Sequence, residues 1–168
     1  EDWGLLPVAE PSLTGNEASY ILQCIENNWV SSSGPFVAQF ERAFADFTGL
    51  KGPVAVSNGT AALTLAMQAL KMPPDSNVIV PSSTFAATAN AVIAAGGIPV
   101  FSDVDPETWG LSPDLVEPLV SPETWGIIPV HLYGNPCDVG GLRRLADTRG
   151  LVMIEDCAEA IGTLVGDR

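Results

Sequence analysis

Short runs of β-branched and other apolar residues alternate with helical stretches along most of this chain. A strand that leads through a helix to another strand usually returns parallel to the first, because the helix carries the chain back across the sheet. The alternation therefore predicts an α/β fold: a three-layer, mostly parallel sheet with flanking helices. The expected strands are Val54–Ser57, Val78–Pro81, Pro99–Asp103, Ile127–His131 and Leu151–Glu155, and the expected helices are Thr60–Leu70, Thr84–Ala95, Pro113–Val120 and Gly140–Thr148.

Two amphipathic helices are expected ahead of this alternation, near Gly15–Asn28 and Pro35–Phe47. The second carries an apolar face that we interpret as core rather than as a ligand-binding surface. This face consists of phenylalanines at helical spacing: Phe36, Phe40, Phe44 and Phe47. No linker or repeat interrupts the chain, so we expect one compact unit. Within it, residues 1–50 form an N-terminal helical segment and residues 51–168 form the α/β part.

The balance of charges limits the partners of this chain. It has 7 Lys+Arg against 20 Asp+Glu, a formal net charge of −13, which disfavours binding to a nucleic-acid backbone or an anionic membrane surface. No apolar run approaches the length that spans a bilayer. We therefore expect neither nucleic acid nor a membrane as a partner, and a cytoplasmic location.

The three cysteines are far apart and form no Cys-x-x-Cys pair. This spacing suggests neither a disulfide framework nor a zinc site, so we expect no metal. Buried free thiols in a cytoplasmic protein are the expected state.

A turn of small residues, Ser57–Thr60, lies where the first expected strand meets a helix. A helix that opens there leaves its first N–H groups unpaired and its positive dipole end exposed, which suits a phosphate group. Turns at the carboxyl ends of parallel strands meet at one edge of the sheet, and these turns carry Phe85 and Asp156. A phosphate seat, an aromatic face and a carboxylate together suit pyridoxal phosphate, whose protonated ring nitrogen requires an acidic partner.

Each of these side chains also has a purely structural interpretation. Phe85 would serve equally as a core aromatic, and Asp156 as a helix cap. Glu159 would serve as a solvated helix residue, and His131 as a buried histidine with satisfied hydrogen bonds. No G-x-G-x-x-G follows the first expected strand, which disfavours a Rossmann-type dinucleotide-binding protein.

Blocks of sequence across nearly the whole chain resemble, in order and spacing, the N-terminal half of a sugar aminotransferase of the DegT/DnrJ/EryC1/StrS family. These enzymes are fold-type-I pyridoxal phosphate enzymes that aminate nucleotide-linked keto-sugars. The matching blocks are Trp29–Ser32 with Gly34, Phe40–Glu41, Ser57–Leu63, Val80–Pro81, Thr84–Phe85 with Asn90, Val130–Gly134 and Ile154–Asp156.

The resemblance implies an aspartate aminotransferase-like fold, in which residues 51–168 are part of the large, cofactor-binding domain. It implies that Gly59 and Thr60 bind the phosphate of pyridoxal phosphate and that Phe85 stacks on its ring. It further implies that Asp156 pairs with the ring nitrogen. Glu159 would lie near the phenolic oxygen of the ring or near the incoming substrate.

The segment Ile154–Gly162 is most similar to the GDP-perosamine synthase branch of the family, because Glu159 stands where many relatives carry Gln or His. This similarity implies a GDP-linked 4-keto-6-deoxy sugar as substrate and an amino acid such as glutamate as nitrogen donor. It also implies a role in O-antigen or other polysaccharide synthesis. Family enzymes are dimers, so a homodimer is expected for the full-length protein.

The family's reactive lysine, which holds the cofactor as a Schiff base, has no counterpart among the lysines of this chain. These are Lys51 and Lys71, both expected to lie away from the pocket, and the resemblance places the reactive lysine beyond Arg168. We therefore expect no catalytic residue here and no activity of the chain alone. Three interpretations remain open: a fragment of an aminotransferase, a sugar dehydratase with histidine in place of the lysine, and a non-catalytic binding or regulatory half-fold.

Overall fold

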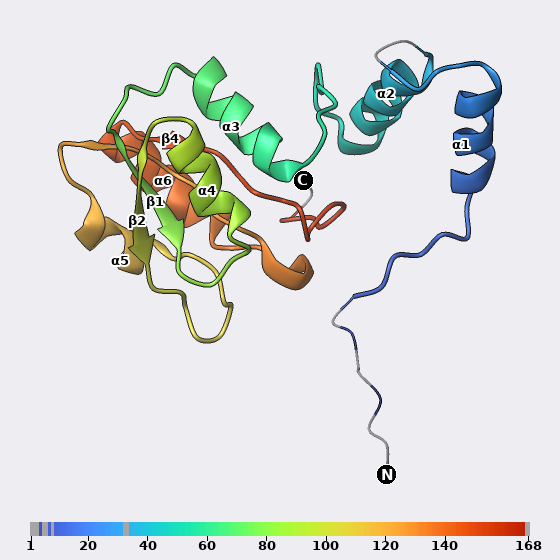
Figure 1. The fold of residues 1–168 in the computed structure, drawn as a ribbon. Coiled ribbons are helices and arrows are strands. Elements are labelled where there is room, and N and C mark those ends of the chain that lie inside the picture. Colours follow the sequence, from blue (N-terminus) through green and yellow to red (C-terminus); the bar gives the residue numbers. More distant parts are fainter. Residues whose placement is uncertain (1–3, 5–6, 8, 32–33, 167–168) are drawn as a thin grey trace. The chain divides into compact units, whose positions relative to one another are not determined.

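The computed structural model describes residues 4, 7, 9–31 and 34–166 of the chain (Figure 1). It divides into two compact units, Glu1–Ala55 and Val56–Arg168, which are described here one at a time. In the described part of the chain, no helix combines the length and the apolar character needed to cross a membrane.

The first unit contains two helices, α1 (Glu17–Glu26) and α2 (Phe36–Thr48). Helix α2 ends at Gly49, whose φ of 71° is a left-handed conformation that glycine adopts without steric cost. Aromatic rings connect the two helices and the turn between them. Phe36 lies with its ring centroid 4.9 Å from that of Tyr20 and 6.1 Å from that of Trp29.

The phenylalanine face of α2 is not a core, contrary to the expectation. Neither helix of this unit has a buried residue, and Phe40 and Phe47 remain 58% and 66% exposed. The helical spacing of the phenylalanines is real, but two short helices do not enclose an interior. An apolar helix face is buried only where another element packs over it, and the described residues of this unit leave much of the α2 face uncovered.

The second unit is built on a four-stranded parallel sheet in the order β2-β1-β3-β4. Its strands are β1 (Asn77–Pro81), β2 (Ile98–Ser102), β3 (Thr124–Ile127) and β4 (Val152–Met153). Its helices are α3 (Gly59–Ala69), α4 (Ala87–Ala94), α5 (Pro113–Val116) and α6 (Val139–Arg149), with short 3₁₀ turns η1 (Glu117–Leu119) and η2 (Leu132–Gly134). This arrangement confirms the predicted α/β class.

Side chains of β1 alternate between two hydrophobic clusters, because successive residues of a strand point to opposite faces. Val78 and Val80 pack with residues of α3 and α4, whereas Ile79 packs with residues of α5 and α6. The sheet therefore lies between two helical layers (Figure 1). All three side chains are fully buried, so this alternation is the centre of the fold.

The predicted strand Val54–Ser57 is wrong. Residues 53–56 have no strand partner among the described residues, and an extended segment without a ladder of hydrogen bonds is not held as a strand. The Ala55 N–H of this segment bonds instead to the Glu41 carboxylate at 2.9 Å. The segment has the apolar composition of a strand, but pairing depends on a neighbour that its own sequence does not specify.

Two other strands are shorter or shifted relative to the prediction. The strand expected over Ile127–His131 ends at Ile127, since Pro129 has no N–H to donate to a ladder. Pairing resumes at a single parallel bridge between Val130 and Asp156. Strand β4 is only two residues long, and among the described residues its one neighbour in the sheet is β3.

The alternation of β1 predicts a stability difference between two isoleucines of this unit. Ile79→Ala should lower the free energy of unfolding by about 2–5 kcal/mol, because it opens a cavity in a fully buried cluster. Ile93→Ala, on α4 and 60% exposed, is the matched control and should cost less than about 1 kcal/mol. Urea unfolding followed by circular dichroism measures both values. Equal losses in the two variants would contradict the assigned faces.

Candidate functional site

Helix α3 begins with a capped turn whose first N–H groups are free to bind an external acceptor. Asn58 is the N-cap, and its side-chain oxygen accepts the Ala61 N–H at 2.9 Å. The N–H groups of Gly59 and Thr60 precede any intrahelical carbonyl partner. A Cβ built on Gly59 would meet no heavy atom within 4 Å, so space lies open beside this turn. The start of α3 thus offers two N–H donors of the kind that anions bind at helix N-termini.

Asp156 lies at the continuation of β4 and is held there by backbone bonds. Its N–H donates to the Pro129 carbonyl at 2.9 Å, and its own carbonyl accepts the His131 N–H at 3.1 Å. One carboxylate oxygen, Oδ1, accepts the Ala158 N–H at 3.2 Å. In the described part of the chain no helix follows Asp156, so the helix-cap interpretation of this residue is wrong.

The other carboxylate oxygen of Asp156 reaches a different element of the fold. Oδ2 accepts a hydrogen bond from the Thr88 hydroxyl on α4 at 3.2 Å. Sequence reasoning missed Thr88. Its only signal was a hydroxyl in the alanine-rich start of α4, and helix periodicity does not show where that hydroxyl bonds.

Phe85 lies in the turn between β1 and α4, where its carbonyl accepts the Thr88 N–H at 3.3 Å. The residue is 77% exposed, which rules out the core interpretation for this unit. An exposed aromatic face on a short, hydrogen-bonded turn is a surface on which a flat ring can stack. The bond from Thr88 to Asp156 places this turn beside the end of β4.

The start of α3 packs against the same hydrophobic cluster as the segment that leads to Asp156. Leu63, in the first turns of α3, is buried in the hydrophobic cluster against which Ile154 packs, two residues before Asp156. Lys71 follows the opposite end of α3 from Gly59. The structure thus links the turn that carries Phe85 to Asp156 through Thr88, and the start of α3 packs against the same hydrophobic cluster as Ile154.

Glu159 has a bond that the sequence did not suggest. Its exposed carboxylate accepts the N–H of Tyr133, which lies in the turn that follows β3, at 3.1 Å. Tyr133 has a φ of 53°, a left-handed conformation that is uncommon for a bulky residue and must be held by its surroundings. Glu159 thus stabilises the turn η2, and its second oxygen remains available to a ligand.

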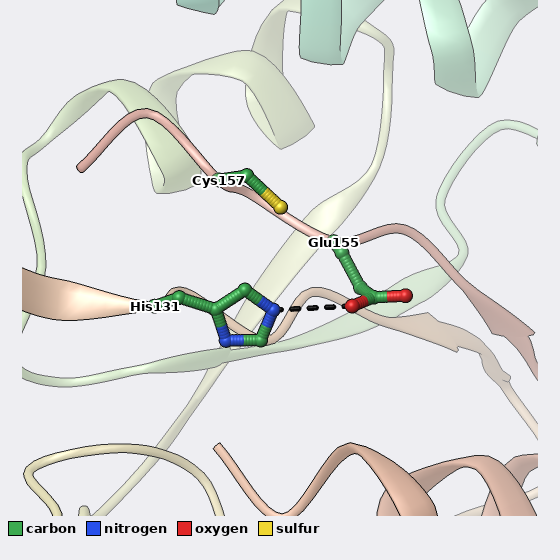
Figure 2. Close-up of side chains that lie close together, drawn as sticks. All are labelled: His131, Glu155 and Cys157. Carbon is green, nitrogen blue, oxygen red and sulfur yellow. Dashed lines mark hydrogen bonds and ion pairs between the residues drawn. The ribbon is translucent and has the colours of Figure 1, made fainter. Parts of the chain in front are cut away.

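His131 is buried, with 4% of its surface exposed, and both of its ring nitrogens are bonded. Nδ1 accepts the Cys137 N–H at 3.1 Å, so the ring proton is on Nε2, which donates to Glu155 Oε2 at 3.1 Å (Figure 2). This agrees with the interpretation of His131 as a satisfied buried histidine. It also fixes the side chain of Glu155, the residue that precedes Asp156.

The cluster of His131, Glu155 and Cys157 has the composition of a metal site, since its three donor atoms lie within 4.8 Å of one another. A histidine nitrogen that carries a proton has no lone pair for a metal ion. Because the Cys137 N–H occupies Nδ1, ligation by Nε2 would require an imidazolate. The hydrogen-bond pattern therefore does not fit a metal site.

The predicted residues fit pyridoxal phosphate by their chemistry. The start of α3 offers donors to a phosphate, Phe85 offers an aromatic face, and Asp156 offers a carboxylate with an acceptor site left on each oxygen.

Residues 11–168 match the DegT/DnrJ/EryC1/StrS aminotransferase family. The chain belongs to this family. A GDP-perosamine synthase from Vibrio cholerae is 44% identical over 164 residues, which cover 98% of this chain and 45% of that protein. The resemblance inferred from the sequence is thereby confirmed.

Solved structures agree with this family assignment. An aminotransferase from Psychrobacter cryohalolentis has a TM-score of 0.86 and 40% identity, covering 93% of this chain and 40% of that one. NtdA from Bacillus subtilis, solved with bound cofactor PMP, has a TM-score of 0.81 and 36% identity over 89% of this chain and 35% of its own. The aspartate aminotransferase-like fold is confirmed, and enzymes of this family depend on pyridoxal phosphate. The chain spans less than half the length of these relatives.

The surroundings of Cys157 raise the pKa of its thiol. Desolvation of the sulfur, followed by the charges of Glu155 and Asp156, raises the pKa of the Cys157 thiol above its ordinary value. A smaller fraction of this thiol is therefore ionised at neutral pH, and the thiolate is the form that reacts with alkylating reagents.

Alkylation of Cys157 by iodoacetamide should accordingly be slow at pH 7.5 and rise steeply at higher pH. Glu155→Gln removes one nearby charge, while its amide oxygen still accepts the bond from His131, and should speed the reaction about two- to tenfold. Glu123→Gln is the control, because Glu123 precedes the amino end of β3 whereas Cys157 follows the carboxyl end of β4. It should leave the rate unchanged. Mass spectrometry of the Cys157 peptide gives the rates. An unchanged rate in Glu155→Gln would contradict the electrostatic account.

Proposed function

We propose that this chain provides the cofactor-binding part of an aminotransferase that acts on a nucleotide-linked 4-keto-6-deoxy sugar. The single observation that carries this proposal is the hydrogen bond from Thr88 to Asp156, which links the carboxylate to the turn that carries Phe85. Membership of the aminotransferase family and similarity to GDP-perosamine synthases support it. Pyridoxal phosphate, when bound, would supply the electron sink for amination.

The residues have distinct tasks under this proposal. The N–H groups of Gly59 and Thr60, with the Thr60 hydroxyl, bind the phosphate. Phe85 stacks on the ring and excludes water from one of its faces. Asp156 accepts a charge-assisted hydrogen bond from the ring nitrogen and keeps that nitrogen protonated. Glu159 approaches the phenolic oxygen or the substrate with the carboxylate oxygen that Tyr133 leaves unused.

We further propose a GDP-linked sugar as substrate, glutamate as nitrogen donor and a role in polysaccharide or O-antigen synthesis. The names of the relatives from Vibrio cholerae and other bacteria support the sugar class. A cytoplasmic homodimer is part of the same proposal. Free rather than disulfide-bonded Cys24, Cys137 and Cys157 are consistent with a reducing compartment.

Cofactor binding tests the assignment of Asp156. Pyridoxamine phosphate is a suitable probe because, unlike the aldehyde, it does not react with lysine amines. Asp156→Asn should weaken its binding about 10- to 100-fold, the loss expected for a hydrogen bond between charged groups. Asp147→Asn, an exposed residue of α6, serves as the control and should bind as the unaltered chain does. Tryptophan fluorescence titration measures the dissociation constants, and equal constants for all three proteins would refute the pairing.

The reaction class is tested with a GDP-linked 4-keto-6-deoxy-hexose and glutamate. The complete product of the coding region should release 2-oxoglutarate and an amino sugar in equal amounts, whereas this chain alone should show no turnover. Mass spectrometry distinguishes the amino sugar from a dehydrated sugar. Dehydration without amination would replace the proposed activity with that of a sugar dehydratase, and turnover by the chain alone would contradict the assignment of no catalytic residue to it.

A further inference from the structure

Thr88 is a fully buried polar residue in the helix that follows Phe85. None of its surface is exposed, and its neighbours on α4 include the buried residues Ala91 and Val92. Its hydroxyl lies 3.2 Å from Asp156 Oδ2 and 3.1 Å from the Thr84 hydroxyl. Burying a hydroxyl without hydrogen-bond partners destabilises the fold. The Thr88 hydroxyl has two such partners, Asp156 and Thr84.

Which hydroxyl donates in each of these two hydrogen bonds follows from the fact that each threonine hydroxyl has one proton. An ionised carboxylate only accepts hydrogen bonds, so the single proton of the Thr88 hydroxyl is donated to Asp156. The bond between the two threonines is then made by the proton of Thr84, with Thr88 as acceptor. The network is a one-way chain from the Thr84 hydroxyl through the Thr88 hydroxyl to Asp156 Oδ2.

The carboxylate of Asp156 consequently has one donor on each oxygen, and the two donors come from different segments. Thr88, on α4, binds Oδ2, and the Ala158 N–H, in the turn after Asp156, binds Oδ1. Two bonds at opposite ends of the group hold the plane of the carboxylate against rotation about its Cβ–Cγ bond. The backbone bonds with Pro129 and His131 hold the main chain of the same residue.

We propose that Thr88 is a positioning residue for Asp156, which fixes the carboxylate in the orientation that keeps the cofactor's ring nitrogen protonated. The inference rests on the proposed function, in which Asp156 pairs with that nitrogen. Thr84 orients Thr88 in turn. Because Thr84 and Phe85 are adjacent, the turn that presents the stacking ring also aligns the carboxylate.

The test uses the full chain with pyridoxamine phosphate labelled with ¹⁵N in its ring, since the ¹⁵N chemical shift of a pyridine reports whether its nitrogen is protonated. The unaltered chain should give the protonated shift. Thr88→Val, which keeps the shape and removes the hydroxyl, should move the resonance part of the way toward that of Asp156→Asn and weaken binding about two- to tenfold. Thr88→Ser restores a hydroxyl and should restore the shift.

Two further variants separate positioning from a loss of stability. Thr84→Val removes the donor to Thr88 but leaves the bond to Asp156, so it should move the resonance less than Thr88→Val does. Thr148→Val, on α6, loses a hydroxyl that bonds to the Arg144 carbonyl of its own helix, and should leave the resonance unmoved. Thermal unfolding is recorded for every variant, and the ¹⁵N shift is compared at temperatures where each one is folded.

The outcomes distinguish this inference from the proposed function. If Asp156→Asn shifts the resonance and Thr88→Val does not, Thr88 is structural only and the positioning inference is overturned. If Asp156→Asn itself leaves the resonance unmoved, or if the unaltered chain does not bind the probe, the proposed pairing fails and the role of Thr88 fails with it. A shift in Thr88→Val that Thr88→Ser does not reverse also counts against the hydroxyl.

Discussion

Parallel pairing of the strands is the constraint on which the candidate site depends. Because the strands of this sheet run in one direction, the turns that follow β1, β3 and β4 all emerge at the same edge. Phe85, His131 and Asp156 stand on those turns or at their beginning. The bridge between Val130 and Asp156 extends this pairing beyond the last regular residues of β3 and β4. Without it, the carboxylate would belong to a free loop.

Hydrogen bonds convert this shared edge into a defined site. Asp156 is reached by a helix hydroxyl, by the amide of its own turn and by two backbone bonds to the segment after β3. Glu155 is fixed by His131, whose tautomer is in turn set by the Cys137 amide. Among the described residues, no buried side-chain nitrogen or oxygen lacks a partner. Such complete satisfaction restricts the polar groups to one arrangement.

The sequence was sufficient for features that arise locally and insufficient for those that depend on distant neighbours. The turn at Asn58 and Gly59 was predictable because capping needs only nearby residues, and strand β1 because its apolar run is fully buried. The segment Val54–Ser57 has the same composition as a strand, yet it lacks a partner. The phenylalanine face of α2 shows the converse case: its period was correct, but burial requires a covering layer. The bond between Thr88 and Asp156 spans 68 positions and leaves no trace in local spacing.

The open space beside Gly59 shows that the fold does not itself require a glycine at this position. This residue lies in the first turn of α3 without a positive φ, so its backbone does not require glycine, and nothing surrounds the position that a methyl group would displace. Neither the backbone conformation nor the packing of the described residues therefore accounts for a glycine at this position. Under the proposed function, in which the Gly59 N–H binds a phosphate, selection for binding would keep a glycine that the fold alone does not require.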